Sequence, residues 1–353
     1  MKIYKNIFQQ IISSENLLHA WDKFKMGKRN KLDVIAFERN LEENIFTLHY
    51  ELKDKIYCHG PYQDFWIHDP KQRHIHKALV RDRVLHHAVF SILNPIFEST
   101  FIPTSFSCRV GYGTHKGVKA LARMTRRISQ NNTHPCFVLK CDVRKFFDTV
   151  DHNILLSILK KRVQDENAFW LLKEIVSSYS LTRERERDEQ NLKGIPIGNL
   201  TSQLFANLYL NELDQFVKHR LRVKNYLRYT DDFALVADSR QFLESYLPPI
   251  REFLKNRLAL TLHPQKISLC RLHQGIDFLG YIVLPHHRLL RTKTRQRIFK
   301  KMQLRIKEYQ QGCISQFRLE QSLQSYLGVL SHANAYQLSE NLKNQFWFWL
   351  NEG

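Results

Sequence analysis

The feature that most constrains this chain is a pair of adjacent aspartates, Asp231 and Asp232, set among apolar, β-prone residues in YLRYTDDFALVAD (226–238). Two neighbouring carboxylates in such a setting repel each other and lose hydration, so they cost stability unless something neutralises them. In a continuous strand they would point to opposite faces. At a tight hairpin both can approach one site, so we expect two short strands that meet near Thr230.

A divalent cation would neutralise this pair, and Mg²⁺ would then need a further protein ligand from elsewhere in the chain. Asp142 is the obvious choice, because it ends an apolar strand in VLKCDVRKFFD and also places a charge at the edge of a buried element. Three carboxylates on two neighbouring strands can hold two metal ions about 3.5–4 Å apart, as in phosphoryl-transfer polymerases and nucleases. For Asp231 and Asp232 alone, the competing interpretation is a turn with solvated acids.

The charge balance points to a polyanionic partner. Lys and Arg number 54 against 34 Asp and Glu among 353 residues, a formal charge of +20, and nucleic acid is the first candidate. Hydrophobic residues make up 43% of the chain, which indicates a folded globular protein. The six cysteines form no C-x-x-C pair and no run approaches a membrane span, so we expect a reducing, cytoplasmic location without a zinc site, a disulfide framework or a membrane.

Hydrophobic spacing predicts an α+β fold with helices packed on one face of a sheet. The elements expected are helices over 1–56, strand and turn over 56–69, a strand and then a helix in 70–93, a basic helix in 111–130, a strand from 136 to 142, a helix capped by Asp151, a helix near 167–178, a charged hairpin or loop at 181–191, a helix after 200, a hairpin at 226–238, a helix at 240–258, strands within 258–270 and 276–284, and a helical tail over 288–353.

Five motifs in order resemble the sequence boxes of reverse transcriptases over about residues 57–285. They are RHIHKALVRDR (73–83), CDVRKFFD (141–148), YTDD (229–232), LHPQK (262–266) and DFLGY (277–281). The resemblance implies a right-hand polymerase fold with palm, fingers and helical thumb, and an RNA-directed DNA polymerase that uses two Mg²⁺ ions. It implies an N-terminal helical extension (1–56), fingers and the start of the palm (57–135), a palm (136–285) with a fingers-like insertion near 152–193, and a basic helical thumb (286–353).

The resemblance also assigns roles to single residues. It implies that the metal ions are bound by Asp142, Asp231, Asp232 and the carbonyl of Val143, and that Lys266 protonates the leaving pyrophosphate. It implies that the incoming triphosphate is bound by Arg73, Arg81 and Arg83. It also implies a primer grip at Phe278, Leu279 and Gly280. Phe147 takes the place of an aromatic plate beneath the nucleotide sugar, which favours dNTPs over rNTPs. Asp148 is one residue out of register for an acid that would select ribose.

The box GIPIGNLTSQ (194–203) departs from the usual Q-G-x-x-x-S-P form. Ile197 replaces the glutamine that lies near the nascent base pair, Gly198 is kept, and Gln203 replaces the proline. This I-G-x-x-x-S-Q form resembles the reverse transcriptases of diversity-generating retroelements, which copy a template RNA with errors at adenines for mutagenic retrohoming. Ile197 can constrain a base pair only through shape, which discriminates less than a satisfied polar contact.

The predicted partners are a template RNA, a DNA or RNA primer, dNTPs and a small basic accessory protein, in a bacterial or phage-encoded system. The segment from Arg288 to Glu308 contains nine Lys or Arg and one acidic residue. This composition fits a thumb helix that lies along the phosphates of a duplex. The residues expected to contact phosphates are Arg291, Lys293, Arg295, Arg297, Lys300 and Lys301.

Other interpretations stay open. A group II intron-like or antiphage-defence reverse transcriptase is the nearest alternative to the diversity-generating type. An RNA-synthesising polymerase is disfavoured by Phe147. A non-catalytic RNA-binding protein on a polymerase fold is disfavoured by the three intact acids, because the loss of catalysis removes the reason to hold them together.

Overall fold

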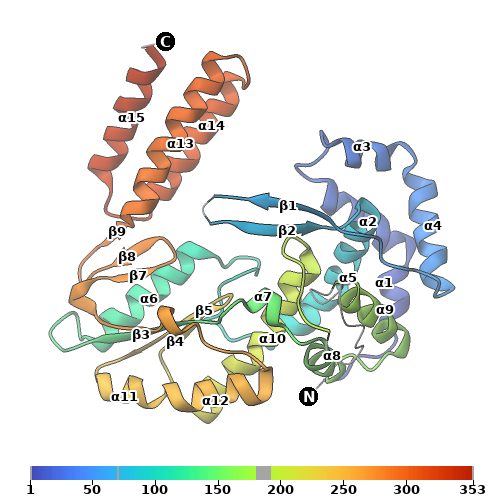
Figure 1. The fold of residues 1–353 in the computed structure, drawn as a ribbon, viewed down its shortest axis with the longest axis horizontal. Coiled ribbons are helices and arrows are strands. Elements are labelled where there is room, and N and C mark those ends of the chain that lie inside the picture. Colours follow the sequence, from blue (N-terminus) through green and yellow to red (C-terminus); the bar gives the residue numbers. More distant parts are fainter. Residues whose placement is uncertain (1, 70, 180–191, 352–353) are drawn as a thin grey trace. The chain divides into compact units, whose positions relative to one another are not determined.

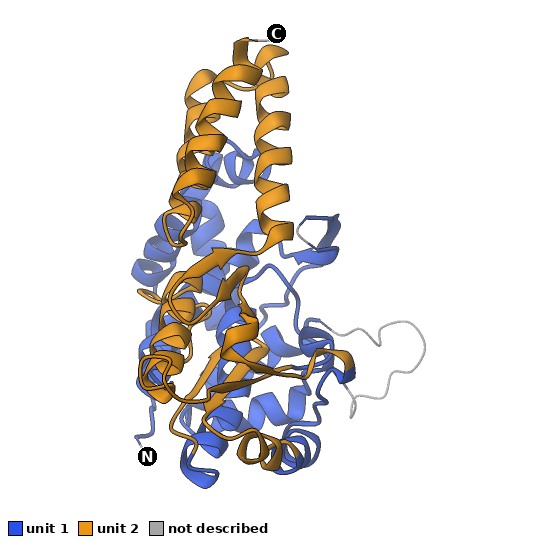
Figure 2. Cartoon of the chain, turned by 90° about the vertical axis from the view of Figure 1, so that its left-hand side faces the viewer, with its two compact units in different colours: residues 1–103, 142–222, 248–264 blue, residues 104–141, 223–247, 265–353 orange. Residues whose placement is uncertain are grey.

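The computed structural model describes residues 2–69, 71–179 and 192–351, and its contacts divide the chain into two compact units (Figure 2). The first unit comprises residues 1–103, 142–222 and 248–264; the second comprises 104–141, 223–247 and 265–353. The chain therefore passes repeatedly between the units. The domain limits expected from the sequence stay a prediction, and the loop expected at 181–191 lies outside the described residues.

The first unit is mainly helical (Figure 1). Its helices are α1 (Phe8–Ile12), α2 (Ser14–Lys25), α3 (Leu32–Arg39), α4 (Leu41–Lys53), α5 (Val80–Glu98), α7 (Phe146–Thr149), α8 (His152–Lys160), α9 (Glu166–Ser177), α10 (Leu200–Gln215), the π-helix η1 (Phe216–Arg220) and α12 (Leu247–Leu258). Side-chain oxygens begin several of them: Ser13 accepts from Asn16 N at α2, and Asp151 accepts from Ile154 N at α8, as predicted.

Helix α5 is the central element of the first unit. It packs against α1, α2, α3 and α10, and most of its apolar side chains are buried. The antiparallel hairpin of β1 (Gln63–Ile67) and β2 (Arg73–Lys77) precedes it in the chain. Strand β2 and helix α5 thus follow each other in the order that the sequence predicted for 70–93.

The second unit holds two sheets. A four-stranded sheet has the order β4 (Tyr226–Tyr229), β5 (Asp232–Ala237), β3 (Phe137–Asp142) and β6 (Ser268–Arg271). A three-stranded sheet consists of β7 (Ile276–Phe278), β8 (Tyr281–Val283) and β9 (Arg288–Leu290). Helix α6 (Thr114–Ile128) packs on both, and its buried residues share one core with the strands; α11 (Arg240–Ser245) packs on β5. The unit boundary falls between Cys141 and Asp142, the last two residues of β3.

The tail forms a bundle of α13 (Thr292–Gln310), α14 (Gln316–Leu330) and α15 (Tyr336–Asn351) around its own apolar core (Figure 1). The sequence interpretation was wrong in one detail, since residues 288–290 form strand β9 rather than helix. The backbone of this segment pairs with β8, and Asn334 N donates to the Arg288 carbonyl at 2.7 Å, so sheet pairing outweighs the basic helical pattern. Among the described residues, no helix has the length and apolar character needed to cross a bilayer.

Candidate active site

The paired aspartates lie at the turn of the β4–β5 hairpin. Tyr229 pairs with Asp232, so Thr230 and Asp231 form a two-residue loop. Thr230 has φ +52° and is the one of the two with positive φ, which matches the first central position of a type II′ turn. Asp231 and Asp232 are both half-buried. The structure therefore confirms that two short strands meet at Thr230.

Neighbouring hydroxyl groups hold this turn. The Thr230 hydroxyl donates to Ser107 Oγ at 2.6 Å, and the Thr114 hydroxyl donates to the Tyr229 phenol oxygen at 3.2 Å. Sequence analysis did not single out Ser107 or Thr114. The only local signal was the run of Ser, Thr and Gly in 104–114, which is typical of any loop.

Asp142 is the last residue of β3 and is buried, with 7% of its surface exposed. Strand β3 is the neighbour of β5, the strand that begins at Asp232. The sequence forms this strand because Val138, Leu139 and Cys141 are buried along it, so the carboxylate marks the end of an apolar run.

The residues after Asp142 pair with the LHPQK box. Val143 and Leu262 form an antiparallel bridge, in which the Asp142 carbonyl accepts from His263 N and Arg144 N donates to the Thr261 carbonyl, both at 2.8 Å. In this pattern the bridge does not use the Val143 carbonyl, which points to the other side of the segment. Lys266 ends the short 3-10 helix η2 (Pro264–Lys266) that follows.

The oxygen atoms of the three aspartates are the candidate ligands for a divalent metal. No three His, Cys, Asp or Glu side chains of the described residues form a group that could hold a metal ion. The oxygens of Asp231 and Asp232 at one turn, and of Asp142 on the adjoining strand, are nevertheless the hard ligands that Mg²⁺ prefers. The chemistry of these donor oxygens therefore fits Mg²⁺.

Phe147 lies beside the GIPIG segment. Phe146 is buried and contacts the Tyr209 ring edge-on, with centroids 6.3 Å apart, whereas Phe147 is half-buried. The carbonyl of Phe147 accepts from Ile195 N at 2.8 Å. The structure therefore ties the residue predicted beneath the sugar to the segment predicted beside the base pair, while Asp148 is exposed.

The segment 197–199 is fixed against β2. The Ile197 carbonyl accepts from His76 N at 3.1 Å, and Asn199 Nδ2 donates to the His76 carbonyl at 3.0 Å. Gly198 has φ +122°, and a Cβ there would lie 3.0 Å from Ile75 Cγ2. Glycine is required at this position by both backbone conformation and space. Asn199, which is buried, is a third residue that the sequence did not single out, after Ser107 and Thr114.

Aromatic rings line one side of the β1–β2 hairpin. Trp66 stacks on His74 with centroids 4.4 Å apart and planes 7° apart, and His74 in turn contacts His76 at 4.3 Å. Burial, followed by the nearby His74, lowers the pKa of His76, so its imidazole is neutral at neutral pH. Burial raises the pKa of Tyr179, whose ring lies 4.8 Å from His76, to about 12.

The three arginines predicted to grip triphosphate lie in different surroundings. Arg73 is exposed at the start of β2, opposite Ile67. Arg81 donates to Glu51 of α4 at 2.8 Å. Arg83 donates to Asp33 of α3 at 2.6 Å, and its guanidinium lies over the Phe24 ring. The guanidinium groups of Arg81 and Arg83 thus join α5 to the N-terminal helices.

The predicted primer grip is the β7–β8 turn. Phe278 is buried and pairs with Tyr281, while Leu279 and Gly280 have φ values of +50° and +89°, as in a type I′ turn. The Gly280 carbonyl accepts from Arg291 N at 3.0 Å.

The expected phosphate contacts follow this turn. Arg291 Nε donates to the Asp277 carboxylate at 2.8 Å. The other expected residues lie on α13, where four are exposed and Arg297 is half-buried; the exposed ones are Lys293, Arg295, Lys300 and Lys301. The exposed cations can reach a polyanion in solution.

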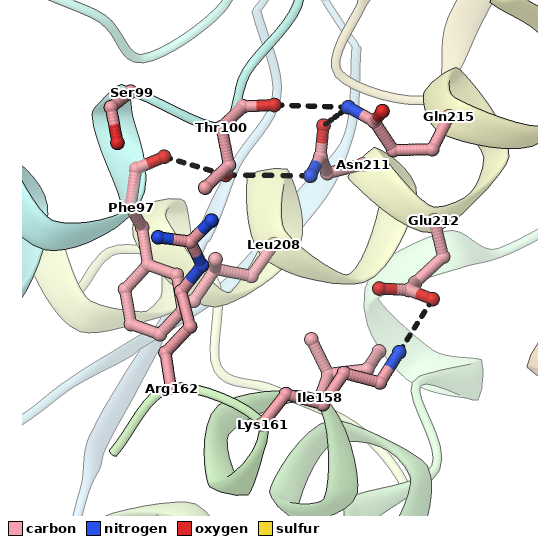
Figure 3. Close-up of a pocket in the computed structure, with 10 residues that line it drawn as sticks. All are labelled: Phe97, Ser99, Thr100, Ile158, Lys161, Arg162, Leu208, Asn211, Glu212 and Gln215. Atoms are coloured by element: carbon pink, nitrogen blue, oxygen red, sulfur yellow. Dashed lines mark hydrogen bonds and ion pairs between the residues drawn. The ribbon is translucent and has the colours of Figure 1, made fainter. Parts of the chain in front are cut away.

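A hollow of about 430 Å³ in the first unit is lined by the ends of α5, α8 and α10 (Figure 3). Gln215 Nε2 donates to the Thr100 carbonyl and to Asn211 Oδ1, at 3.0 and 3.2 Å, and Lys161 pairs with Glu212 at 2.7 Å. These polar groups therefore bond to one another. None of the site residues predicted from the sequence lines this hollow.

Comparison with known proteins identifies the class. The family model described as reverse transcriptase (RNA-dependent DNA polymerase) matches residues 68–283, more than half of the chain. The chain therefore belongs to the reverse transcriptase family. Its fold is the α+β right-hand polymerase fold predicted from the sequence.

Individual relatives are distant. Protein YkfC of Escherichia coli K12 is 25% identical over 248 residues, which cover 61% of this chain and 62% of the relative. The group II intron-encoded protein LtrA of Lactococcus lactis is 23% identical over 305 residues, covering 68% and 49%. A solved structure of apo telomerase from Candida tropicalis is similar at a TM-score of 0.49 and 11% identity, covering 70% of this chain and 60% of the telomerase chain. The chain thus spans 62% of YkfC and 49% of LtrA, less than two thirds of either relative.

Proposed function

We propose that this chain is an RNA-directed DNA polymerase that extends a primer along a template RNA with dNTPs and two Mg²⁺ ions. The observation that carries the proposal is the β4–β5 turn, which presents Asp231 and Asp232 beside the strand that ends at Asp142, in a chain of the reverse transcriptase family. Structural reasons alone do not account for three carboxylates at the ends of buried strands.

Asp142, Asp231, Asp232 and the Val143 carbonyl would hold the metal ions. When bound, Mg²⁺ lowers the pKa of the attacking primer hydroxyl and neutralises the triphosphate and the leaving pyrophosphate. The protein's own part is to fix the carboxylates, which the β3 and β5 backbones do. Lys266 would donate a proton to the leaving pyrophosphate.

The incoming nucleotide would bind between the elements described above. Phe147 would lie beneath the sugar, where its ring excludes a 2′-hydroxyl, and Ile197 and Gly198 would border the nascent base pair. Arg73, exposed at the start of β2, would contact the triphosphate. A similar role for Arg81 and Arg83 would require sharing their guanidinium groups with Glu51 and Asp33.

The duplex would contact the primer-grip turn at Phe278, Leu279 and Gly280 and the cationic side chains of α13. Affinity for a polyanion falls as the salt concentration rises. Each Lys or Arg that neutralises a phosphate makes the slope of log affinity against log salt more negative by about 0.7–0.9. The exposed residues Lys293, Arg295, Lys300 and Lys301 support this role.

For the subtype we propose a diversity-generating reverse transcriptase, error-prone at adenines and assisted by a small basic accessory protein in the cytoplasm of a bacterial host. The I-G-x-x-x-S-Q box supports it. The second candidate is a group II intron-like enzyme, which the likeness to LtrA favours. An antiphage-defence enzyme and a non-catalytic RNA-binding protein are the remaining alternatives.

The test is primer extension on an adenine-containing RNA template with Mg²⁺ and dNTPs, with the flanking RNA and any small neighbouring open reading frame supplied. Metal-dependent cDNA that disappears in the Asp231→Asn, Asp232→Asn variant is expected, with errors concentrated opposite adenine. Accurate cDNA would retain the polymerase and favour the intron-like or defence types. Absence of extension in the wild-type protein with those partners present would move the proposal to RNA binding alone.

A further inference from the structure

A fully buried arginine lies directly before the paired aspartates. Arg228, in β4, has 0% of its surface exposed and is among the largest fully buried side chains. It pairs across the hairpin with Phe233, which is also buried. Withdrawing a guanidinium from water costs several kcal/mol in proteins, so its bonding partners must compensate for that cost. The burial of Arg228 next to the turn therefore indicates that its guanidinium has a specific function in the hairpin.

The Arg228 side chain bonds to the turn itself. Its Nη1 donates to the Thr230 carbonyl at 3.0 Å, and Thr230 is the residue with φ +52°. A β-branched residue in this region is strained by about 1–3 kcal/mol and persists only where its surroundings hold it. The guanidinium therefore fixes the peptide that leads into Asp231.

The segment 104–107 holds the same turn from the edge of the sheet. Arg228 N donates to the Thr104 carbonyl and Phe106 N donates to the Arg228 carbonyl, both at 2.9 Å. Ser107, with 3% of its surface exposed, accepts from the Thr230 hydroxyl at 2.6 Å. Thr230 is thus bonded through its carbonyl to Arg228 and through its hydroxyl to Ser107.

We infer that Arg228 and Ser107 are positioning residues that set the carboxylates of Asp231 and Asp232 for metal binding. The inference rests on the proposed function, because it takes these aspartates to be metal ligands. Metal and catalytic constellations need their ligands held within about 0.5 Å of the productive geometry. Without the two bonds, the strained Thr230 backbone can relax, which rotates the peptide before Asp231 and separates the ligands.

The experiment measures metal binding rather than turnover. Mn²⁺ is titrated by electron paramagnetic resonance into the full chain bound to RNA template, a DNA primer lacking its 3′-hydroxyl, and dNTP. The sites in question are those lost in the Asp231→Asn, Asp232→Asn variant. Arg228→Met, Arg228→Lys and Ser107→Ala are compared with the wild-type protein, and Arg240→Met is the control, because Arg240 is an exposed residue of the second unit paired with Glu244.

We expect the half-saturating Mn²⁺ concentration to rise about tenfold in Arg228→Met and about threefold in Ser107→Ala. Arg228→Lys, which keeps a donor and the charge, should recover part of the loss, and Arg240→Met should match the wild-type protein. Ser107→Ala removes only a hydroxyl, so it keeps the test decisive if Arg228→Met fails to fold.

Two negative outcomes are distinguishable. If the Asp231→Asn, Asp232→Asn variant binds as much Mn²⁺ as the wild-type protein, the proposed metal site is wrong. If that variant loses binding while Arg228→Met and Ser107→Ala lower the unfolding free energy with unchanged Mn²⁺ affinity, the two residues only stabilise the fold and this inference is overturned.

Discussion

Two sharp turns of this protein each contain a residue with positive φ, and their surroundings stabilise that conformation in different ways. The 197–199 segment of the first unit turns at Gly198, with φ +122°, and the β4–β5 hairpin of the second unit turns at Thr230, with φ +52°. Glycine adopts positive φ without strain, whereas a β-branched residue does not. The turn at Gly198 therefore requires only that no side chain is present, whereas the turn at Thr230 requires hydrogen bonds that hold its strained backbone.

The surroundings of each turn reflect that difference. Gly198 lies against Ile75, with main-chain and amide bonds to His76 on either side. Thr230 is bonded by Arg228 and Ser107 through groups that only these side chains supply. The turn at Gly198 thus depends on the absence of a side chain, and the turn at Thr230 depends on hydrogen bonds from neighbouring side chains.

The largest effect is expected for Gly198→Ala. The strained φ and the 3.0 Å approach to Ile75 Cγ2 should lower the unfolding free energy by about 1–3 kcal/mol and displace β2. Because β2 and the 197–199 segment are proposed to contact the incoming nucleotide, KM for dNTP should rise as well. Urea unfolding and steady-state extension kinetics measure the two effects.

A matched control separates strain from contact. Gly27 also has positive φ, +70°, but a Cβ there would meet nothing within 4 Å. Gly27→Ala should cost only backbone strain and leave KM for dNTP unchanged. An equal rise of KM in both variants would mean that the crowding against Ile75 does not matter for nucleotide binding.

An intermediate effect is expected at Thr230. Thr230→Val keeps the branched side chain but loses the bond to Ser107, whereas Thr230→Gly loses the bond and relieves the positive φ. Glycine should therefore be the more stable of the two variants by about 1 kcal/mol, after its greater freedom in the unfolded chain is counted. Denaturant unfolding of both variants gives the difference, and a valine variant at least as stable as the glycine variant would show that the turn stores no strain.

The sequence predicted the hairpin at Thr230, the strand before Asp142 and the Asp151 cap because each depends on local pattern: apolar runs, turn residues and a capping carboxylate. It could not predict the bond between Thr230 and Ser107, since these residues are 123 positions apart. Arg228 is only two positions from Thr230, but no sequence pattern shows that its guanidinium is buried and turns back to the Thr230 carbonyl. Nor could it show that Arg81 and Arg83 pair with Glu51 and Asp33, because a motif fixes spacing along the chain and not partners in space. Strand β9 was mistaken for helix because the basic residues that follow it continue a helical pattern, although residues 288–290 pair with the nearby strand β8.

The smallest effect on stability, and the most specific on function, is expected for Ile197→Gln. Ile197 is half-buried and its carbonyl, rather than its side chain, accepts the bond from His76 N, so the turn at Gly198 should persist in the variant. A glutamine amide could bond to the nascent base pair, which adds discrimination that shape alone does not provide. The unfolding free energy should change by less than about 1.5 kcal/mol, which is the upper end of the net contribution of a single hydrogen bond. Sequencing of the cDNA should show fewer errors opposite template adenine, while the total yield stays close to that of the wild-type protein. An unchanged error spectrum would show that the side chain at position 197 does not set fidelity. The turn at Gly198 would then shape the backbone without affecting the choice of nucleotide.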